Sequence, residues 1–269
     1  MPEGNVIHHQ ARRLSRAFRQ HEVRIDSPQG RFAEGARLLT GHTVTKVEAH
    51  GKHLFIGFDN RRWIHIHLGL FGKWRFGTGE PPEPQGQLRL RIMTDERYAE
   101  LRCPTVCEVL DAAEKKAAIA RIGPDPIRKD ADPDRAWVKV HRSAAPIGSL
   151  LMNQQVFAGV GNIYRAEVLF RHGISPYRPG RDITREEFDA IWEDLVVLMT
   201  AGTKRGRIDT VRLEHLPEAM GRAPREDRHG GEVYVYRRAG RECYLCDTEV
   251  LIADMQGRNL YWCPACQAS

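Results

Sequence analysis

The stretch LLMNQQVFAGVGNIYRAEVLFRHGISP, residues 150–176, decides the fold of the second half of the chain. Apolar residues recur at three- and four-residue spacing on both sides of its centre, which predicts helices near 146–154 and 161–172. Between them lies Gly159-Val160-Gly161-Asn162, where two glycines allow the backbone to approach a ligand closely. The second helix begins with free N–H groups that suit a phosphate oxygen, and Asn162 adds a side-chain donor. A Gly-x-Gly between helices is also an ordinary turn, so both interpretations stay open at this point.

The tail that follows carries four of the six cysteines, as Cys243-x-x-Cys246 and Cys263-x-x-Cys266. Four thiolates at this spacing predict a tetrahedral Zn²⁺ site at the ends of two β-knuckles, with paired strands near 250–252 and 260–262. Because sulfur fills every position, we expect one structural Zn²⁺ that stabilises a tail too small to fold alone. Arg258 lies near the tip of this hairpin, either as a solvated arginine or as a group that enters a DNA groove or contacts a phosphate.

Towards the N-terminus the pattern changes from helical to alternating. A helix is expected over residues 5–20 with Asn5 as its N-cap, followed by an antiparallel β domain, a sandwich against which this helix packs. The clearest strands are 43–47, 54–56, 63–67 and 88–92. Lys52 falls in the predicted turn Gly51-Lys52, where a lysine is usually solvated but can instead project toward a phosphate or a lesion as a point charge.

The stiff segment Gly123-Pro124-Asp125-Pro126 suggests a domain boundary. We therefore expect an α+β protein of three parts: a β-sandwich domain over 1–122, a helical domain over 123–231 and a zinc hairpin over 232–269. Within the second part, residues 203–230 are polar and rich in Arg and Gly. They predict a mobile loop. For the Arg-rich stretch around 204–231, contact with DNA, capping of a displaced base and simple disorder all stay open.

The amino-acid composition indicates which class of partner the protein binds. The chain has 269 residues, with 41% hydrophobic and 28% charged residues, which excludes a disordered protein. The net charge of +6 favours a polyanionic partner, although a solvated basic surface explains it as well. The opening MPEGNVIHH lacks the layout of a signal peptide, and there is no apolar run long enough to span a membrane. We expect a cytoplasmic protein with no membrane contact.

The second residue is a proline. Initiator methionine is normally removed before proline, which would leave Pro2 with a free secondary amine. An α-amine has a pKa of about 8, so a useful fraction is neutral near neutral pH. Such an amine can attack C1′ of a deoxyribose, expel the base and form an iminium ion, with Glu3 as general acid. On these residues alone, a frayed terminus is the simpler interpretation.

Together and in this order, these features resemble the formamidopyrimidine-DNA glycosylase/endonuclease VIII family over essentially the whole chain. The matching stretches are MPEG, HGKHLF, HLGLFGKWR, LLMNQQVFAGVGNIYRAEVLFRHGISP and CYLCDTEVLIADMQGRNLYWCPACQ. The resemblance implies a base-excision-repair enzyme of bacteria, both DNA glycosylase and abasic-site lyase. It also implies damaged double-stranded DNA as the partner, a helix–two-turn–helix motif and a zinc-finger hairpin. No small-molecule cofactor is implied, and we expect a monomer.

The resemblance also assigns roles. Pro2 matches the family's nucleophile and Glu3 its proton donor, while Lys52 matches a lysine that donates protons and contacts phosphate. Leu70 matches the wedge that fills the gap left by a flipped nucleotide. The remaining matches are phosphate contacts: Gly161 and Asn162 in the helix–two-turn–helix motif, and Arg258, which grips phosphate near the lesion.

The opening Pro-Glu-Gly is similar to the endonuclease VIII branch, which prefers oxidised pyrimidines. Gly69-Leu70-Phe71 departs from the Gln-Leu-Tyr wedge of that branch, and residues 102–107 lack the Arg-x-Phe pattern of the purine branch. The preferred lesion, the opposite base, strand preference and the extent of β,δ-elimination therefore stay open. Two competing hypotheses are a non-catalytic DNA-binding protein on the same scaffold and a zinc-ribbon nucleic-acid binder that acts through its tail.

Overall fold

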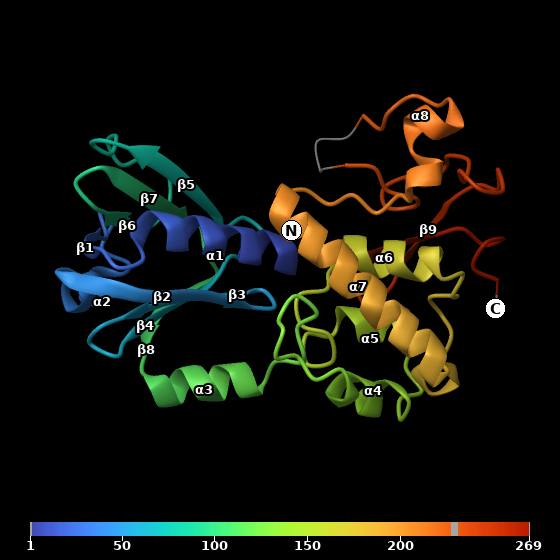
Figure 1. Ribbon diagram of the computed structural model, residues 1–269, viewed down its shortest axis with the longest axis horizontal. Coiled ribbons are helices and arrows are strands. Elements are labelled where there is room, and N and C mark those ends of the chain that lie inside the picture. The colour runs from blue at the N-terminus through green and yellow to red at the C-terminus, as the bar shows by residue number, and fades with distance from the viewer. Residues whose placement is uncertain (1, 227–230, 269) are drawn as a thin grey trace. The chain divides into compact units, whose positions relative to one another are not determined.

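The computed structural model describes residues 2–226 and 231–268, which form two compact units, Met1–Arg121 and Ile122–Ser269 (Figure 1). Each unit has its own buried apolar cluster. The α+β fold class expected from the sequence is confirmed. The second unit holds both the helices and the cysteine-rich tail around one core, so a separate domain over 232–269 stays a proposal.

The first unit is an antiparallel sheet of eight strands in the order β5-β7-β6-β1-β2-β3-β4-β8. Strand β1 joins its two halves, because its first residues pair with β2 and its last residues pair with β6. Figure 1 shows β5 to β7 and β2 to β4 as two layers. The strands are β1 (Glu22–Asp26), β2 (His42–His50), β3 (His53–Phe58), β4 (Trp63–His67), β5 (Lys73–Thr78), β6 (Leu88–Met93), β7 (Arg97–Arg102) and β8 (Val106–Leu110).

Helix α1 (Gly4–Phe18) packs on β2 and β3 because one of its faces is apolar. Its buried apolar side chains recur at helical spacing: Ile7, Ala11, Leu14 and Phe18. The prediction of Asn5 as N-cap is wrong. Glu3 occupies that position in extended conformation and Asn5 lies inside the first turn, fully buried. Two shorter helices, α2 (Ala33–Leu39) and α3 (Ala112–Ala120), complete this unit, and the sequence analysis missed both.

The register of the second half-sheet brings distant residues to one end. His50 pairs with His53 across the β2–β3 turn, and His53 pairs with His67 at the end of β4. His67 in turn pairs with Val106 at the start of β8. The β2–β3 turn and the loop after β4 therefore lie at the same end of the sheet.

The second unit is built on helices. The helices of this unit pack around a core that includes Phe157, Leu169 and Leu195. The helices are α4 (Asp134–Val140), α5 (Ile147–Met152), α6 (Asn162–Arg171), α7 (Arg185–Arg205) and α8 (Pro217–Met220), and the tail adds β9 (Leu251–Asp254) paired with β10 (Asn259–Trp262). Among the described residues, no helix is long and apolar enough to cross a membrane.

The expectation of an irregular loop over 203–230 is partly wrong. Helix α7 continues to Arg205 and ends at Gly206, whose φ of 76° is readily adopted by glycine. The segment beyond it contains a 3-10 turn, Leu213–His215, and α8. Its arginines form internal ion pairs, such as Arg222 with Glu232 at 2.6 Å. Residues 227–230 lie outside the described residues, so the expectation of mobility is not tested there.

Candidate active site and nucleic-acid interface

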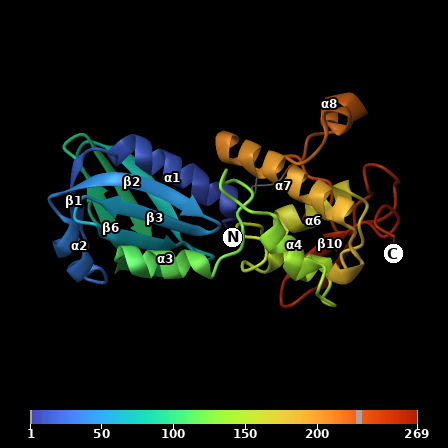
Figure 2. The same ribbon diagram turned by 60° about the horizontal axis from the view of Figure 1, so that its bottom comes forward.

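The chain start leads directly into α1. Pro2 is half-buried and precedes Glu3, whose side chain is 2% exposed. The carboxylate of Glu3 does not cap the helix, although its backbone oxygen accepts hydrogen bonds from Val6 and Ile7. Both views place the first residues of α1 and the β2–β3 turn at the same end of the first unit (Figure 1, Figure 2).

The β2–β3 turn presents Lys52. Gly51 has a φ of 56°, in the left-handed region, which closes a tight hairpin between His50 and His53. Lys52 is 7% exposed, unlike the solvated lysine usual at a hairpin tip. A buried ammonium requires hydrogen-bonding partners or a polyanion, so this position favours a functional lysine over a solvated one.

The loop after β4 carries an exposed apolar tip. Leu70 is 59% exposed and Phe71 is 76% exposed. Gly69 holds the loop at a φ of 65°, and a Cβ on it would lie 1.8 Å from Thr105 Oγ1, so only glycine fits. Two adjacent apolar side chains at one loop tip suit insertion into a base stack.

A row of histidines lies beside Lys52 on β3 and β4. The pKa of His53 is lowered to about 3, first by burial and then by electrostatic interaction with His65, His67, His50 and Lys52. The pKa of His67 is also lowered, again by burial first and then by Lys52. His53 and His67 are therefore neutral at neutral pH, and both lie within electrostatic range of the Lys52 ammonium. The sequence analysis missed these histidines, although their alternation along 63–67 was visible.

In the second unit, the turn between α5 and α6 is stabilised by hydrogen bonds within the turn itself. Gln154 Nε2 donates to the carbonyl of Val160 at 2.9 Å, and Gln154 Oε1 accepts from the backbone N–H of Gly159 at 3.0 Å. Gly159 has a φ of 87°. Gly161 is the N-cap of α6, so the backbone N–H groups of the first helical turn follow it directly.

Asn162 joins this turn to the tail hairpin. Its Nδ2 donates to the carbonyl of Asn259 at 2.7 Å, and Arg165 donates to both Asn162 Oδ1 and the same carbonyl. Arg165 is 1% exposed, whereas Asn162 is half-buried and Asn259 is exposed, so the joint combines a buried guanidinium with an accessible surface. The sequence analysis missed Arg165; its spacing of three residues from Asn162 on one helix was the available signal.

Arg258 lies next to that joint, in the turn between β9 and β10. Its side chain is exposed, and it lines a groove of about 290 Å³ that includes Asn153 and Met152 of α5. The turn is closed by a hydrogen bond from the N–H of Met255 to the carbonyl of Arg258 at 2.9 Å. Gly161, Asn162 and Arg258 thus lie at one joint of the second unit, whereas Pro2, Glu3, Lys52 and Leu70 belong to the first.

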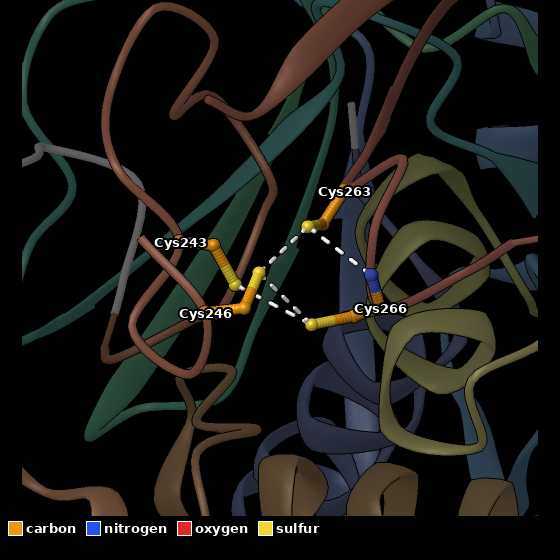
Figure 3. Close-up of side chains that lie close together, drawn as sticks. All are labelled: Cys243, Cys246, Cys263 and Cys266. Carbon is orange, nitrogen blue, oxygen red and sulfur yellow. Dashed lines mark hydrogen bonds between the residues drawn. The ribbon is translucent and has the colours of Figure 1, made fainter. Parts of the chain in front are cut away.

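The four cysteines converge as their spacing predicted (Figure 3). Their Sγ atoms all lie within 4.8 Å of one another, with Cys243 and Cys266 at 3.8 Å. Tetrahedral thiolates about 2.3 Å from a Zn²⁺ would be separated by about 3.8 Å, so the donor set fits that ion. Backbone N–H groups of Leu245 and Cys266 point at the sulfurs of Cys243 and Cys263, both at 3.5 Å. The cluster is thus a candidate metal centre.

Two family models match most of the chain. The model of the formamidopyrimidine-DNA glycosylase N-terminal domain matches residues 1–105, and that of its H2TH domain matches residues 122–213. Endonuclease 8 1 of Mycobacterium tuberculosis H37Rv is 48% identical over 274 residues, covering 99% of this chain and all of the relative. The probable endonuclease 8 2 of Streptomyces coelicolor is 32% identical over 280 residues, covering 100% of this chain and 94% of the relative.

Solved structures support the fold. The Lactococcus lactis Fpg in complex with abasic-site-containing DNA superposes with a TM-score of 0.81 at 20% identity, covering 99% of this chain and 100% of that chain. Its complex with an N7-benzyl-Fapy-dG-containing DNA matches with the same TM-score at 22% identity, over 100% of both chains.

The chain belongs to the formamidopyrimidine-DNA glycosylase/endonuclease VIII family, and it is an enzyme of the DNA glycosylase and abasic-site lyase class. Within that family its similarity is to the endonuclease VIII branch, because its curated relatives at 48% and 32% identity bear that name.

Proposed function

We propose that this enzyme removes oxidised bases from double-stranded DNA, with pyrimidines favoured, and cuts the resulting abasic site through a Schiff base on Pro2. The observation that carries the proposal is that the start of α1, which directly follows Pro2 and the buried Glu3, and the β2–β3 turn, which holds the buried Lys52, lie at one end of the first unit. DNA is proposed as the partner because solved relatives of the same fold were crystallised with damaged DNA.

In the proposed chemistry, the neutral amine of Pro2 attacks C1′ of the damaged nucleotide as the sugar ring opens. Glu3 donates a proton to the ring oxygen, the C1′–N bond breaks, and the base leaves with its electron pair and takes up a proton. The resulting iminium ion acidifies C2′. Loss of a C2′ proton then expels the 3′ phosphate by β-elimination, and a second elimination releases the 5′ phosphate. Water finally hydrolyses the iminium and restores the amine.

The remaining groups position the strand. Lys52 supplies positive charge and a proton near the reacting sugar, and Leu70 fills the space vacated by the flipped nucleotide. Gly161, Asn162 and Arg258 contact phosphates from the second unit. Zn²⁺ bound by the four cysteines would supply folding free energy to the tail and hold the turn that carries Arg258; it takes no part in the reaction.

The proposal is tested by borohydride trapping. Full-length enzyme incubated with a duplex that contains one thymine glycol or one abasic site should form a covalent adduct, whereas an enzyme whose Pro2 amine is blocked by an N-terminal tag that cannot be removed should form none. Glu3→Gln should bind the same duplex normally but excise the base about 10²–10⁴-fold more slowly, the typical contribution of a positioned general acid. Glu96→Gln removes the same charge from an exposed side chain and serves as control.

The outcomes separate the competing functions. Damaged-DNA binding without any adduct would favour a non-catalytic binder, and equal binding by the isolated tail would favour a zinc-ribbon protein. Trapping on 8-oxoguanine in preference to thymine glycol would overturn the pyrimidine preference and retain the Schiff base. Adducts of unchanged yield with the blocked N-terminus would overturn Pro2 as the nucleophile.

A further inference from the structure

Two histidines and a glutamate form a continuous hydrogen-bonded row across three strands. His53 Nδ1 lies 2.8 Å from His65 Nε2, and His65 Nδ1 lies 2.8 Å from Glu108 Oε1. His65 pairs with Glu108 in the register of β4 and β8, so their side chains lie on the same face of the sheet. The row begins beside the turn that carries Lys52 and ends at a half-exposed carboxylate.

The row is held rigidly. His65 is 6% exposed and stacks on Phe55 at a ring distance of 4.9 Å, with the planes 11° apart. His53 also packs against His65 and His67, with ring centroids 5.1 Å and 4.9 Å away. Such packing leaves the imidazole rings no freedom to rotate, so their hydrogen bonds are set by the rings' protonation.

This geometry determines which nitrogen carries each proton. The oxygens of a carboxylate group accept hydrogen bonds, so His65 Nδ1 carries the proton of its 2.8 Å hydrogen bond to Glu108 Oε1. In a neutral His65, Nε2 then has a lone pair and accepts, so His53 Nδ1 must carry a proton and donate. Because His53 is neutral at this pH, its Nε2 has a bare lone pair.

Charged and titratable groups surround the row, and the Lys52 ammonium among them is a donor that can use that lone pair. His50 and Lys52 lie at the turn, His67 lies on β4, and Glu48 pairs with Lys115 of α3 on the same face. The Lys52 ammonium has three donors and no acceptor. A neighbouring histidine that presented an N–H, or a positive charge, would oppose this ammonium; an acceptor supports it.

We propose that Glu108, His65 and His53 act as a positioning relay for Lys52. The carboxylate sets the tautomers of both histidines, and His53 thereby presents an unprotonated Nε2 at the end of the sheet where Lys52 lies. The relay rests on the proposed function in one respect, the role of Lys52 in catalysis. Its three members are proposed to act through Lys52, so they are positioning residues.

The tautomers can be measured without any substrate. Long-range ¹H–¹⁵N spectra of the full-length, histidine-labelled enzyme at pH 7 should show His53 protonated at Nδ1 and bare at Nε2. In Glu108→Gln the amide can donate or accept, so the Nδ1–H preference of His65 and His53 should be lost. Glu108→Asp should retain it. A wild-type His53 protonated at Nε2 would overturn the relay.

Enzyme kinetics test whether the relay supports the catalytic role of Lys52. Glu108→Gln and His65→Phe, which keeps the stack on Phe55, should lower kcat for abasic-site cleavage about tenfold and leave KM within about twofold, as loss of an outer hydrogen-bond partner does elsewhere. Glu108→Asp should recover most of the rate. Glu34→Gln is the matched control, because Glu34 is exposed and lines the same 550 Å³ pocket as Glu108.

The outcomes remain separable. Wild-type kcat in a folded Glu108→Gln variant with altered tautomers would overturn the positioning role. Failure of the wild-type enzyme to cut any lesion would overturn the proposed function together with that role, whereas the spectra would still decide the relay's geometry. Thermal unfolding of each variant shows whether a lost rate reflects lost folding.

Discussion

At the scale of single residues, the environment of a side chain determines its chemistry more than its type does. His53 and Lys52 are neighbours in sequence; Lys52 is buried to a degree unusual for a lysine, and His53 is half-buried. Burial keeps the imidazole neutral and surrounds the ammonium with polar groups. A lysine with such neighbours is suited to hold one position, which a solvated lysine at a hairpin tip is not.

The depressed pKa of His53 predicts how stability depends on pH. In the unfolded chain His53 binds a proton below about pH 6.5. In the folded chain it stays unprotonated until the pH falls to about 3. The free energy of unfolding should therefore fall as the pH is lowered from 6.5 towards 3, because protons favour the unfolded state. The contribution of this one group is at most about 1.4 kcal/mol per pH unit.

Urea unfolding of wild type and His53→Gln between pH 4 and 8 measures that contribution. The variant should show a shallower loss of stability in acid, and above pH 7 the two curves should run parallel. Equal slopes at pH 4–6 would mean that His53 is protonated in the folded enzyme.

At the scale of elements, one buried carboxylate on α6 fastens the segment that follows α7. Glu167 is fully buried and accepts hydrogen bonds from the backbone N–H groups of Tyr234, Val235 and Tyr236 at 2.6 to 2.9 Å. It also accepts from Thr210 Oγ1 at 2.5 Å. Glu167 therefore ties together the two ends of the Arg-rich segment. The described part of that segment is therefore fixed by hydrogen bonds, although its composition suggests a free loop.

Replacement of Glu167 by Gln should loosen that segment. The amide removes the charge and leaves at least one N–H of 234–236 with a weaker acceptor, at a cost on the order of 3 kcal/mol for charge-assisted bonds. Hydrogen exchange should show faster exchange at Tyr234, Val235 and Tyr236, and urea unfolding should show the loss of stability. Glu193→Gln, an exposed change on α7, is the control; equal exchange in both variants would contradict the tie.

At the scale of the whole molecule, two hydrophobic cores divide the enzyme's tasks. The first core supports Pro2, Glu3 and the Lys52 turn, and the second supports α6 and the tail. Cys243 and Cys263 are themselves buried members of the second core. The tail is further fixed by Gln267, whose Nε2 donates to the carbonyl of Ile174 at 3.0 Å.

Removal of the expected Zn²⁺ should therefore affect the two units unequally. A chelator strong enough to extract the ion, or Cys246→Ser, should expose the tail to rapid hydrogen exchange and weaken DNA binding at least tenfold, because the turn that holds Arg258 loses its support. Exchange in β2, β3 and β4 should be unchanged. Elemental analysis should find one zinc per chain; a zinc-free preparation with full DNA binding would contradict the prediction.

Local patterns in the sequence determine several structural features of this enzyme. The Cys-x-x-Cys pairs predict a metal knuckle because their ligands are close in sequence, and the Gly-x-Gly turn and helical periodicity predict α5 and α6 for the same reason. The roles of Pro2, Glu3, Lys52, Asn162 and Arg258 came from family resemblance, and they stay predictions.

Tertiary structure alone decided the rest. The burial of Lys52, the Arg165 joint and the Glu108–His65–His53 relay depend on contacts between residues 12 to 94 positions apart. Such contacts are set by strand register and by the docking of the tail on α6, which no local propensity encodes. Local spacing predicts which groups are near in sequence; only the assembled sheet and the packed core determine which of them are buried and which are joined by a hydrogen bond.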